Sequence, residues 1–171
     1  MAKILIVDDE VAIRRTLRDI LEFEKHVVDE SGDGLDGLAK IKRNKYDVVI
    51  MDIKMPKMDG LEALDRVQIL APDTPVIMIS GHGNIETAVE AVKKGAFDYS
   101  SKPPDLNRLL ITIRNAMDKS SLITETKVLK RRVNKSKTQE IIGETDSISK
   151  IKSTIERVAP TDARVLITGS N

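Results

Sequence analysis

Five short aliphatic runs, separated by longer amphipathic stretches, constrain the fold of this 171-residue chain more than any other feature. The runs cover residues 4–7, 27–28, 48–51 and 76–79, with a last short piece at 97–102. Continuous apolar runs are typical of strands that are buried on both faces. Because helical stretches alternate with these runs, the sequence predicts an α/β fold with a five-stranded, parallel, doubly wound sheet.

The intervening stretches have the spacing of amphipathic helices. Apolar residues recur every three or four positions in five segments, at about 10–24, 35–41, 61–70, 85–94 and 106–117. Turn-forming pairs such as Asp59-Gly60 and Lys94-Gly95 bound these segments. A sheet of this kind places its functional site outside the carboxyl ends of the strands, so the residues that follow each run are the first candidates.

Acidic, hydroxyl and ammonium groups follow four of the runs. Asp8 and Asp9 come after the first, Asp52 after the third and Ser80 after the fourth, and Lys102 stands at the end of the fifth. Taken alone, Asp9 fits a helix N-cap and Asp8 a solvated loop acid. With Asp52 beside them, however, like charges would repel in one crevice, and a divalent cation would relieve that repulsion.

Oxygen ligands in a chain without cysteine favour Mg²⁺, which is commonly bound by carboxylates together with phosphate oxygens. An aspartate can then act as a nucleophile toward phosphorus and form an aspartyl phosphate. Lys102 would pair with one phosphoryl oxygen and Ser80 would donate to another, although a surface lysine is the ordinary alternative. With two Phe, two Tyr and no Trp, we do not expect the chain to bind single-stranded nucleic acid on an aromatic platform.

The first 120 or so residues resemble a response-regulator receiver domain, with ILIVDDE, DVVIMDIKMPKMDG, VIMISGHG and AFDYSSKP in the expected order. The resemblance implies a flavodoxin-like sheet of strand order 2-1-3-4-5 and a switch rather than an enzyme, with a sensor histidine kinase as its partner. The alternative class is a Mg²⁺-dependent phosphatase or a flavodoxin-like cofactor domain. Against it, no second acid stands two residues after Asp52, and no phosphate-binding loop follows the first strand.

The resemblance assigns roles to seven positions. They are the acidic pair Asp8 and Asp9, the phosphoacceptor Asp52, the switch hydroxyl Ser80, the switch aromatic Tyr99, the phosphate-binding Lys102, and Lys54, whose main-chain carbonyl would meet Mg²⁺. It also implies a cis bond between Lys102 and Pro103.

An alternative role for Tyr99 and two further roles, for His82 and His26, complete the sequence-based assignments. Tyr99 is otherwise a packing residue with its hydroxyl in water. We expect His82, with Lys54, to influence water access to the acyl phosphate, and His26 to be structural.

Charge divides the chain into three parts: a receiver domain at 1–118 with net charge −4, a helical linker at 119–140 with net charge +5, and the remainder at 141–171. Leu122, Thr126, Leu129 and Val133 lie at helical spacing in the linker. This spacing fits either a dimeric coiled coil or a solvated connector. We expect a homodimer built mainly from the fifth helix and the linker.

Residues 141–171 resemble the start of the AAA+ ATPase domain of sigma-54-dependent activators of the nitrogen-regulator class. The pattern predicts a helix at 148–158 and a strand at 165–169, and Gly169 would be the first glycine of a Walker A loop whose lysine is absent. We therefore expect an incomplete, poorly ordered fragment without ATPase activity. Sigma-54 RNA polymerase and DNA would be reached only through domains absent from this chain.

Without an apolar run of about 20 residues, we expect a cytoplasmic protein with no membrane partner.

Overall fold

The computed structural model describes residues 1–81, 85–136, 143–161, 164 and 166. The chain forms two compact units, Met1–Lys127 and Val128–Asn171.

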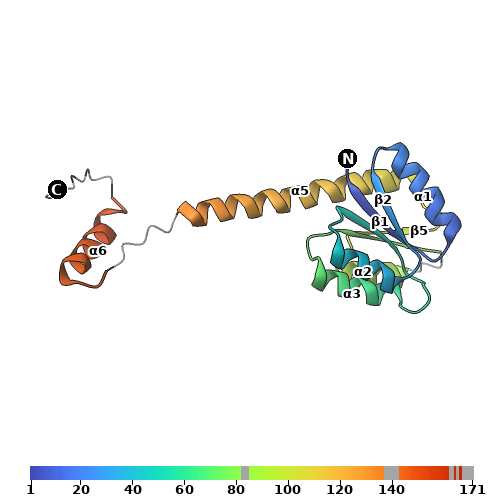
Figure 1. Cartoon of the computed structure of the whole chain (residues 1–171), viewed down its shortest axis with the longest axis horizontal. Coiled ribbons are helices and arrows are strands. Elements are labelled where there is room, and N and C mark those ends of the chain that lie inside the picture. The colour runs from blue at the N-terminus through green and yellow to red at the C-terminus, as the bar shows by residue number, and fades with distance from the viewer. Residues whose placement is uncertain (82–84, 137–142, 162–163, 165, 167–171) are drawn as a thin grey trace. The chain divides into compact units, whose positions relative to one another are not determined.

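Five parallel strands form the sheet of the first unit, in the order β2-β1-β3-β4-β5 (Figure 1). The strands are β1 (Lys3–Val7), β2 (Val27–Ser31), β3 (Val48–Asp52), β4 (Val76–Ser80) and β5 (Asp98–Ser101). The helices that alternate with them are α1 (Val11–Phe23), α2 (Gly34–Arg43), α3 (Gly60–Leu70), α4 (Ile85–Lys93) and α5 (Leu106–Ser136). The predicted doubly wound fold and its strand order are confirmed.

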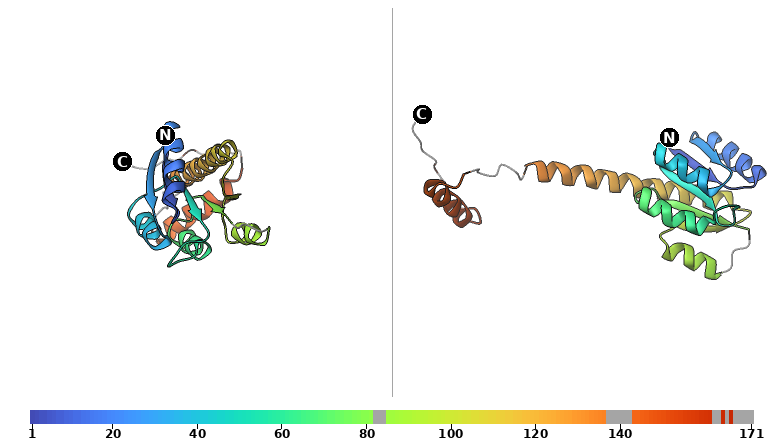
Figure 2. Two further views of the ribbon diagram at one scale, coloured as in Figure 1. Left: turned by 90° about the vertical axis from the view of Figure 1, so that its right-hand side faces the viewer. Right: turned by 60° about the horizontal axis from the view of Figure 1, so that its bottom comes forward.

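Each face of the sheet has its own hydrophobic core, because alternate residues of a strand point to opposite faces. On one face, Ile6 and Ile50 pack with residues of α1 and α5. On the other, Leu5 and Met51 pack with residues of α2, α3 and α4. Figures 1 and 2 show α1 and α5 on one side of the sheet and α2 and α3 on the other. Every residue of β3 and β4 is buried. The last residues of these two strands, at their carboxyl ends, are therefore buried as well.

The turn that follows β3 is folded back tightly on the strand. Asp59 caps α3 by accepting a hydrogen bond from the Leu61 amide. The Gly60 amide donates to the carbonyl oxygen of Ile53 at 2.7 Å. A Cβ atom on Gly60 would lie 2.0 Å from the carbonyl oxygen of Asp52. Glycine is therefore required here because the two backbone segments approach so closely.

The predicted fifth helix and residues 119–136 of the predicted linker form one continuous helix, α5, of 31 residues. Ile113, near its start, is buried against the sheet, whereas Leu122 and Leu129 are exposed. The last residues of the predicted linker lie outside the described ones. Although α5 is long, it is polar, and no helix among the described residues combines the length and apolar character needed to cross a membrane.

The second unit contains α6 (Asp146–Val158), which confirms the helix predicted at 148–158. Thr145 caps it, and its hydroxyl accepts a hydrogen bond from the Ile148 amide. The strand predicted at 165–169 lies outside the described residues, apart from Leu166, which has no regular secondary structure.

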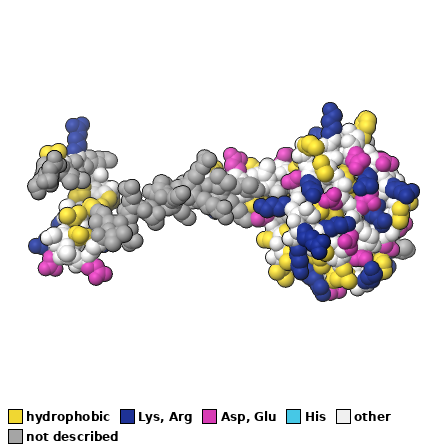
Figure 3. Space-filling view, viewed as in Figure 1, with side chains coloured by type: hydrophobic (Ala, Val, Ile, Leu, Met, Phe, Trp, Pro, Cys, Tyr) yellow, Lys and Arg dark blue, Asp and Glu magenta, His cyan; other side chains and the backbone are white. Residues whose placement is uncertain are grey.

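The surface of the first unit carries mixed charge. On the face drawn in Figure 3, basic and acidic side chains are intermixed. Exposed side chains of this unit also form ion pairs, for example Arg66 with Glu62 at 2.7 Å. Exposed pairs of this kind contribute about 0.2–1 kcal/mol each. On this face, neither sign of charge predominates over a large area (Figure 3).

Candidate functional site

Four of the predicted site residues meet at the carboxyl edge of the sheet. Asp8 follows β1, Asp52 ends β3, and Ser80 ends β4. All three are almost completely buried, with exposed fractions of 0%, 3% and 1% respectively. Lys102 follows β5, and its backbone amide donates to the Ser80 carbonyl oxygen at 2.8 Å. The convergence predicted from the strand ends is therefore present.

The ammonium group of Lys102 lies at the centre of this site. Its Nζ atom is 2.8 Å from Asp8 Oδ2, 2.8 Å from Asp52 Oδ2 and 3.1 Å from Glu10 Oε1. The lysine side chain is only 8% exposed. A buried ammonium thus joins carboxylates from two strand ends and from the β1–α1 loop.

Burial and nearby charges have opposing effects on the pKa of Asp52 and on the pKa of Lys102. Burial raises the pKa of Asp52 above its ordinary value, and this outweighs the opposing effect of the Lys102 ammonium. Burial alone would lower the pKa of Lys102, but its hydrogen bonds to the carboxylates, first to Asp52, raise that pKa above its ordinary value. The lysine therefore stays protonated at neutral pH, and the charged form of Asp52 is less favourable than that of an aspartate in water.

Three carboxylates are close enough to hold one cation. One oxygen each of Asp8, Glu10 and Asp52 can be chosen so that all three lie within 4.8 Å of one another. In addition, Asp52 Oδ1 is buried and has no hydrogen-bond partner among the described residues. A buried carboxylate oxygen without a partner needs either a cation or a donor. An all-oxygen set with excess negative charge fits Mg²⁺.

Asp9 and Glu10 differ in how they lie relative to this cluster of acids. Asp9 is exposed and is not one of the three clustered acids, whereas Glu10 is one of them. Glu10 was not among the predicted site residues, although it stands directly after the acidic pair in ILIVDDE. The contact that brings it into the site joins it to Lys102, 92 residues away in the chain.

Arg14 on α1 supports the loop that carries these acids. Its Nη1 atom donates to the main-chain oxygen of Asp8 at 2.6 Å, and its Nε atom lies 3.4 Å from Glu30 Oε2 on β2. The backbone amide of Glu10 donates to Asp8 Oδ1 at 2.9 Å. These contacts fix the direction of the Asp8 side chain.

In the part of the chain that the structure describes, the other predicted residues form no hydrogen bond or ion pair with Lys102, and one of them is not described. Tyr99 on β5 is half-buried, and its hydroxyl has no hydrogen-bond partner among the described residues. Lys54 is exposed in the β3–α3 loop, and His82 lies outside the described residues. The peptide bond between Lys102 and Pro103 is cis, as the resemblance implied.

His26 lies apart from the acidic edge. Its Nδ1 atom accepts a hydrogen bond from the Ala2 amide at 3.3 Å, ahead of β1. Burial lowers the pKa of His26, which matches a neutral ring that accepts this bond. The contact agrees with the predicted structural role.

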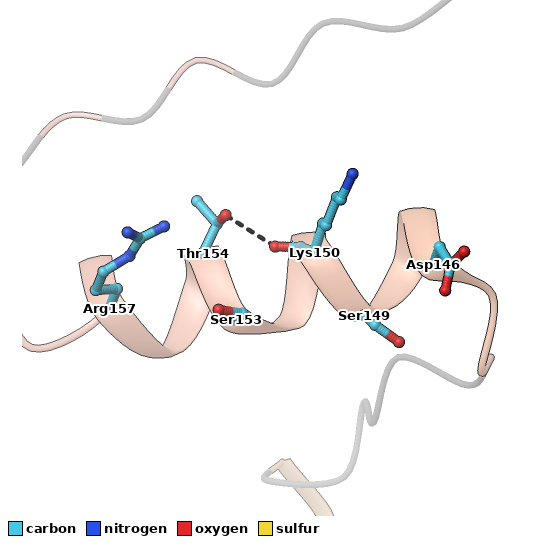
Figure 4. A pocket seen from close by; sticks show the side chains of 6 residues that line it. All are labelled: Asp146, Ser149, Lys150, Ser153, Thr154 and Arg157. Atoms are coloured by element: carbon cyan, nitrogen blue, oxygen red, sulfur yellow. Dashed lines mark hydrogen bonds between the residues drawn. The ribbon is translucent and has the colours of Figure 1, made fainter.

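A pocket also lies along α6 in the second unit. It measures about 580 Å³ and is lined by Asp146, Ser149, Lys150, Ser153, Thr154 and Arg157 (Figure 4). The Thr154 hydroxyl donates to the Lys150 carbonyl oxygen at 2.8 Å. Because all six lining side chains come from one helix, they do not converge on a common point, and the hollow lacks the form of a ligand site.

The chain is similar to regulators of bacterial transcription. Residues 4–114 match the family described as the response regulator receiver domain. The chain is 38% identical over 168 residues to the nitrogen assimilation regulatory protein NtrX of Azorhizobium caulinodans, which covers 97% of this chain and 36% of that protein. It is 33% identical over 167 residues to the C4-dicarboxylate transport transcriptional regulatory protein DctD of Rhizobium meliloti, again over 97% of this chain and 36% of that protein. The chain thus spans about 36% of the length of these curated relatives.

Solved structures of a regulator and of an isolated receiver domain also match this chain. NtrX from Brucella abortus matches with a TM-score of 0.71 and 39% identity, over 96% of this chain and 36% of that one. The beryllofluoride-activated NtrC4 receiver domain dimer matches with a TM-score of 0.66 and 38% identity, over 69% of this chain and 98% of that one. The match to the NtrC4 structure thus covers nearly all of an isolated receiver domain.

Proposed function

The chain belongs to the response regulator receiver domain family, and on that premise we propose that Asp52 accepts a phosphoryl group from a sensor histidine kinase. The observation that carries the proposal is the setting of Asp52. It is buried at the end of β3, its Oδ2 atom lies 2.8 Å from the Lys102 ammonium, and its Oδ1 atom has no hydrogen-bond partner among the described residues. A carboxylate held in this way is oriented to act as a nucleophile.

In the proposed transfer, a carboxylate oxygen of Asp52 attacks the phosphorus atom of a phosphohistidine. The new O–P bond forms as the P–N bond breaks, and the electron pair leaves with the imidazole nitrogen of the kinase. Lys102 pairs with the negative charge on the transferring group, and the Ser80 hydroxyl donates to one of its oxygens. The product is an acyl phosphate on Asp52.

We propose that Mg²⁺ is held by Asp8, Asp9, Asp52 and the main-chain carbonyl of Lys54. The clustered carboxylates of Asp8, Glu10 and Asp52 and the unpartnered Asp52 Oδ1 support a cation here. The assignment of the exposed Asp9 rests on the resemblance to receiver domains. When bound, Mg²⁺ offsets the negative charge that the carboxylates and the phosphoryl group bring together.

The consequence of phosphorylation is a change of partner rather than catalytic turnover. We propose that Ser80 and Tyr99 respond to the phosphoryl group and alter the face formed by α4, β5 and α5. The unpartnered Tyr99 hydroxyl supports such a response, because a new hydrogen bond would stabilise a different position of the ring.

The long helix α5 would carry the response to the rest of the protein. Leu122 and Leu129, one heptad apart, are exposed along it, which supports a homodimer. The relatives are named as transcriptional regulators. We propose that a longer protein of this kind reaches DNA and sigma-54 RNA polymerase through domains outside this chain.

Intact-mass spectrometry after incubation with acetyl phosphate and Mg²⁺ tests the proposal. We expect one added phosphoryl group on the wild type and none when EDTA replaces Mg²⁺. Asp52→Asn should abolish stable labelling, because an amide is a poor nucleophile, whereas Asp19→Asn, which changes an exposed acid on α1, should label as the wild type does. Full labelling of Asp52→Asn would refute the assignment.

A further inference from the structure

The Lys102 ammonium has three carboxylate partners, and these differ sharply in exposure. An ammonium group has three hydrogen-bond donors and no acceptor. Asp8 and Asp52 are 0% and 3% exposed, whereas the Glu10 side chain is 58% exposed. The contact with Glu10 is also the longest of the three, at 3.1 Å against 2.8 Å for the others. Glu10 is therefore the partner that the lysine can give up most easily.

We propose that Glu10 is a positioning residue that holds Lys102 while Asp52 is unphosphorylated and releases it when a phosphoryl group arrives. The inference rests on the proposed function. Lys102 donates hydrogen bonds to Glu10 and Asp52 and forms an ion pair with Asp8, so a phosphoryl oxygen that approaches it competes with these carboxylates for the ammonium group. A released Glu10 carboxylate is hydrated by solvent, whereas a released Asp8 would remain a buried charge without a partner, which is strongly unfavourable.

The position of Glu10 means that its negative charge has opposite effects on the binding of Mg²⁺ and of a phosphoryl group. Its carboxylate lies within 4.8 Å of oxygens of both Asp8 and Asp52. The negative charge of Glu10 therefore attracts a divalent cation into the acidic site. The same charge repels an anionic phosphoryl group and competes with it for Lys102. Removal of the charge should weaken Mg²⁺ binding and strengthen binding of a phosphoryl mimic.

The test compares Glu10→Gln with the wild type in two titrations. Mg²⁺ affinity is measured from the melting temperature as a function of Mg²⁺ concentration. Beryllofluoride affinity is then measured at a Mg²⁺ concentration that saturates every variant. From the range typical of exposed ion pairs, we expect the Kd for Mg²⁺ to rise about twofold to fivefold and the Kd for beryllofluoride to fall by a similar factor.

Two further variants separate charge from position. Glu10→Asp keeps the charge but shortens the side chain, so we expect near-normal Mg²⁺ affinity together with tighter beryllofluoride binding. Glu22→Gln is the matched control, because Glu22 is 52% exposed, forms an ion pair with Arg18 at 3.4 Å and lies near the end of α1, the helix that Glu10 precedes. It stands three turns farther along, about 18 Å away, so we expect it to change neither Kd.

The outcomes distinguish this inference from the proposed function. A wild type that binds Mg²⁺ and beryllofluoride, with a Glu10→Gln variant in which both affinities fall or neither changes, would overturn the role of Glu10 alone. A wild type that binds neither ligand would refute the proposed function and this inference with it.

Discussion

Replacement of Gly60 by alanine tests how the fold holds the end of β3. The added methyl group would lie 2.0 Å from the Asp52 carbonyl oxygen and 2.8 Å from the Cα atom of Ile53. Both contacts are with backbone atoms, so no side chain can rotate away to make room. The β3–α3 loop must move, and the 2.7 Å hydrogen bond from the Gly60 amide to the Ile53 carbonyl oxygen is then lost or weakened.

The expected cost follows from these two effects. Extra atoms forced into a well-packed site typically cost about 1–3 kcal/mol. A lost hydrogen bond adds about 1 kcal/mol. We therefore expect Gly60→Ala to lower the free energy of unfolding by about 2–4 kcal/mol, a large share of the roughly 5–15 kcal/mol that holds a typical domain together.

Urea unfolding followed by circular dichroism measures this change. Gly32→Ala is the control, because a Cβ atom there would meet only the tip of the Arg14 side chain, at 3.7 Å. We expect the control to stay within about 1 kcal/mol of the wild type, since it mainly restricts the unfolded chain. If Gly60→Ala unfolds at the same urea concentration as the control, the close approach does not constrain the loop, and the reasoning is wrong.

Three further predictions concern the site and the assembly. Saturating Mg²⁺ should raise the melting temperature, since a ligand that binds only the native state adds about 2.7 kcal/mol at a hundredfold excess over Kd; an unchanged melting temperature in a chain shown to bind Mg²⁺ would count against the acidic site. Without Mg²⁺, stability should fall as the pH rises from the ordinary Asp pKa of 3.8 through the raised pKa of Asp52, because the native state binds more protons there than the unfolded state does. Urea titrations across this range should show a shallower fall for Asp52→Asn, and equal slopes would contradict the shift. Light scattering should find a dimer for residues 1–171 and a monomer for residues 1–117; a monomeric long form, or equal dimerisation of both, would exclude a dimer driven by α5.

The sequence predicts the interior of this fold better than its edges. β3 and β4 are buried along their whole length, so their aliphatic runs mark both strands to within one residue. β2 lies at the edge of the sheet and continues to Ser31, although only residues 27–28 are aliphatic. Its polar residues Asp29 and Glu30 are tolerated because they pair with Lys3 and Arg14. Such pairing depends on tertiary contacts that hydrophobic periodicity does not contain.

The same limit applies to the site. Strand ends locate Asp8, Asp52, Ser80 and Lys102, because parallel strands bring their carboxyl ends to one edge. Glu10 could not be found in this way, since its place in the site depends on how far its side chain extends over the pocket. Its signal in the sequence is only a third consecutive acid, which is ordinary on a solvated loop.

The most direct test of the account is to locate the phosphoryl group by chemistry that marks only an acyl phosphate. Borohydride reduces a phosphorylated carboxylate to an alcohol, and tandem mass spectrometry of the digested protein then identifies the altered residue. After incubation with acetyl phosphate and Mg²⁺, the account predicts reduction at Asp52 and no reduction when Mg²⁺ is withheld. Reduction at Asp8, Asp9 or Glu10 with Asp52 intact would contradict it.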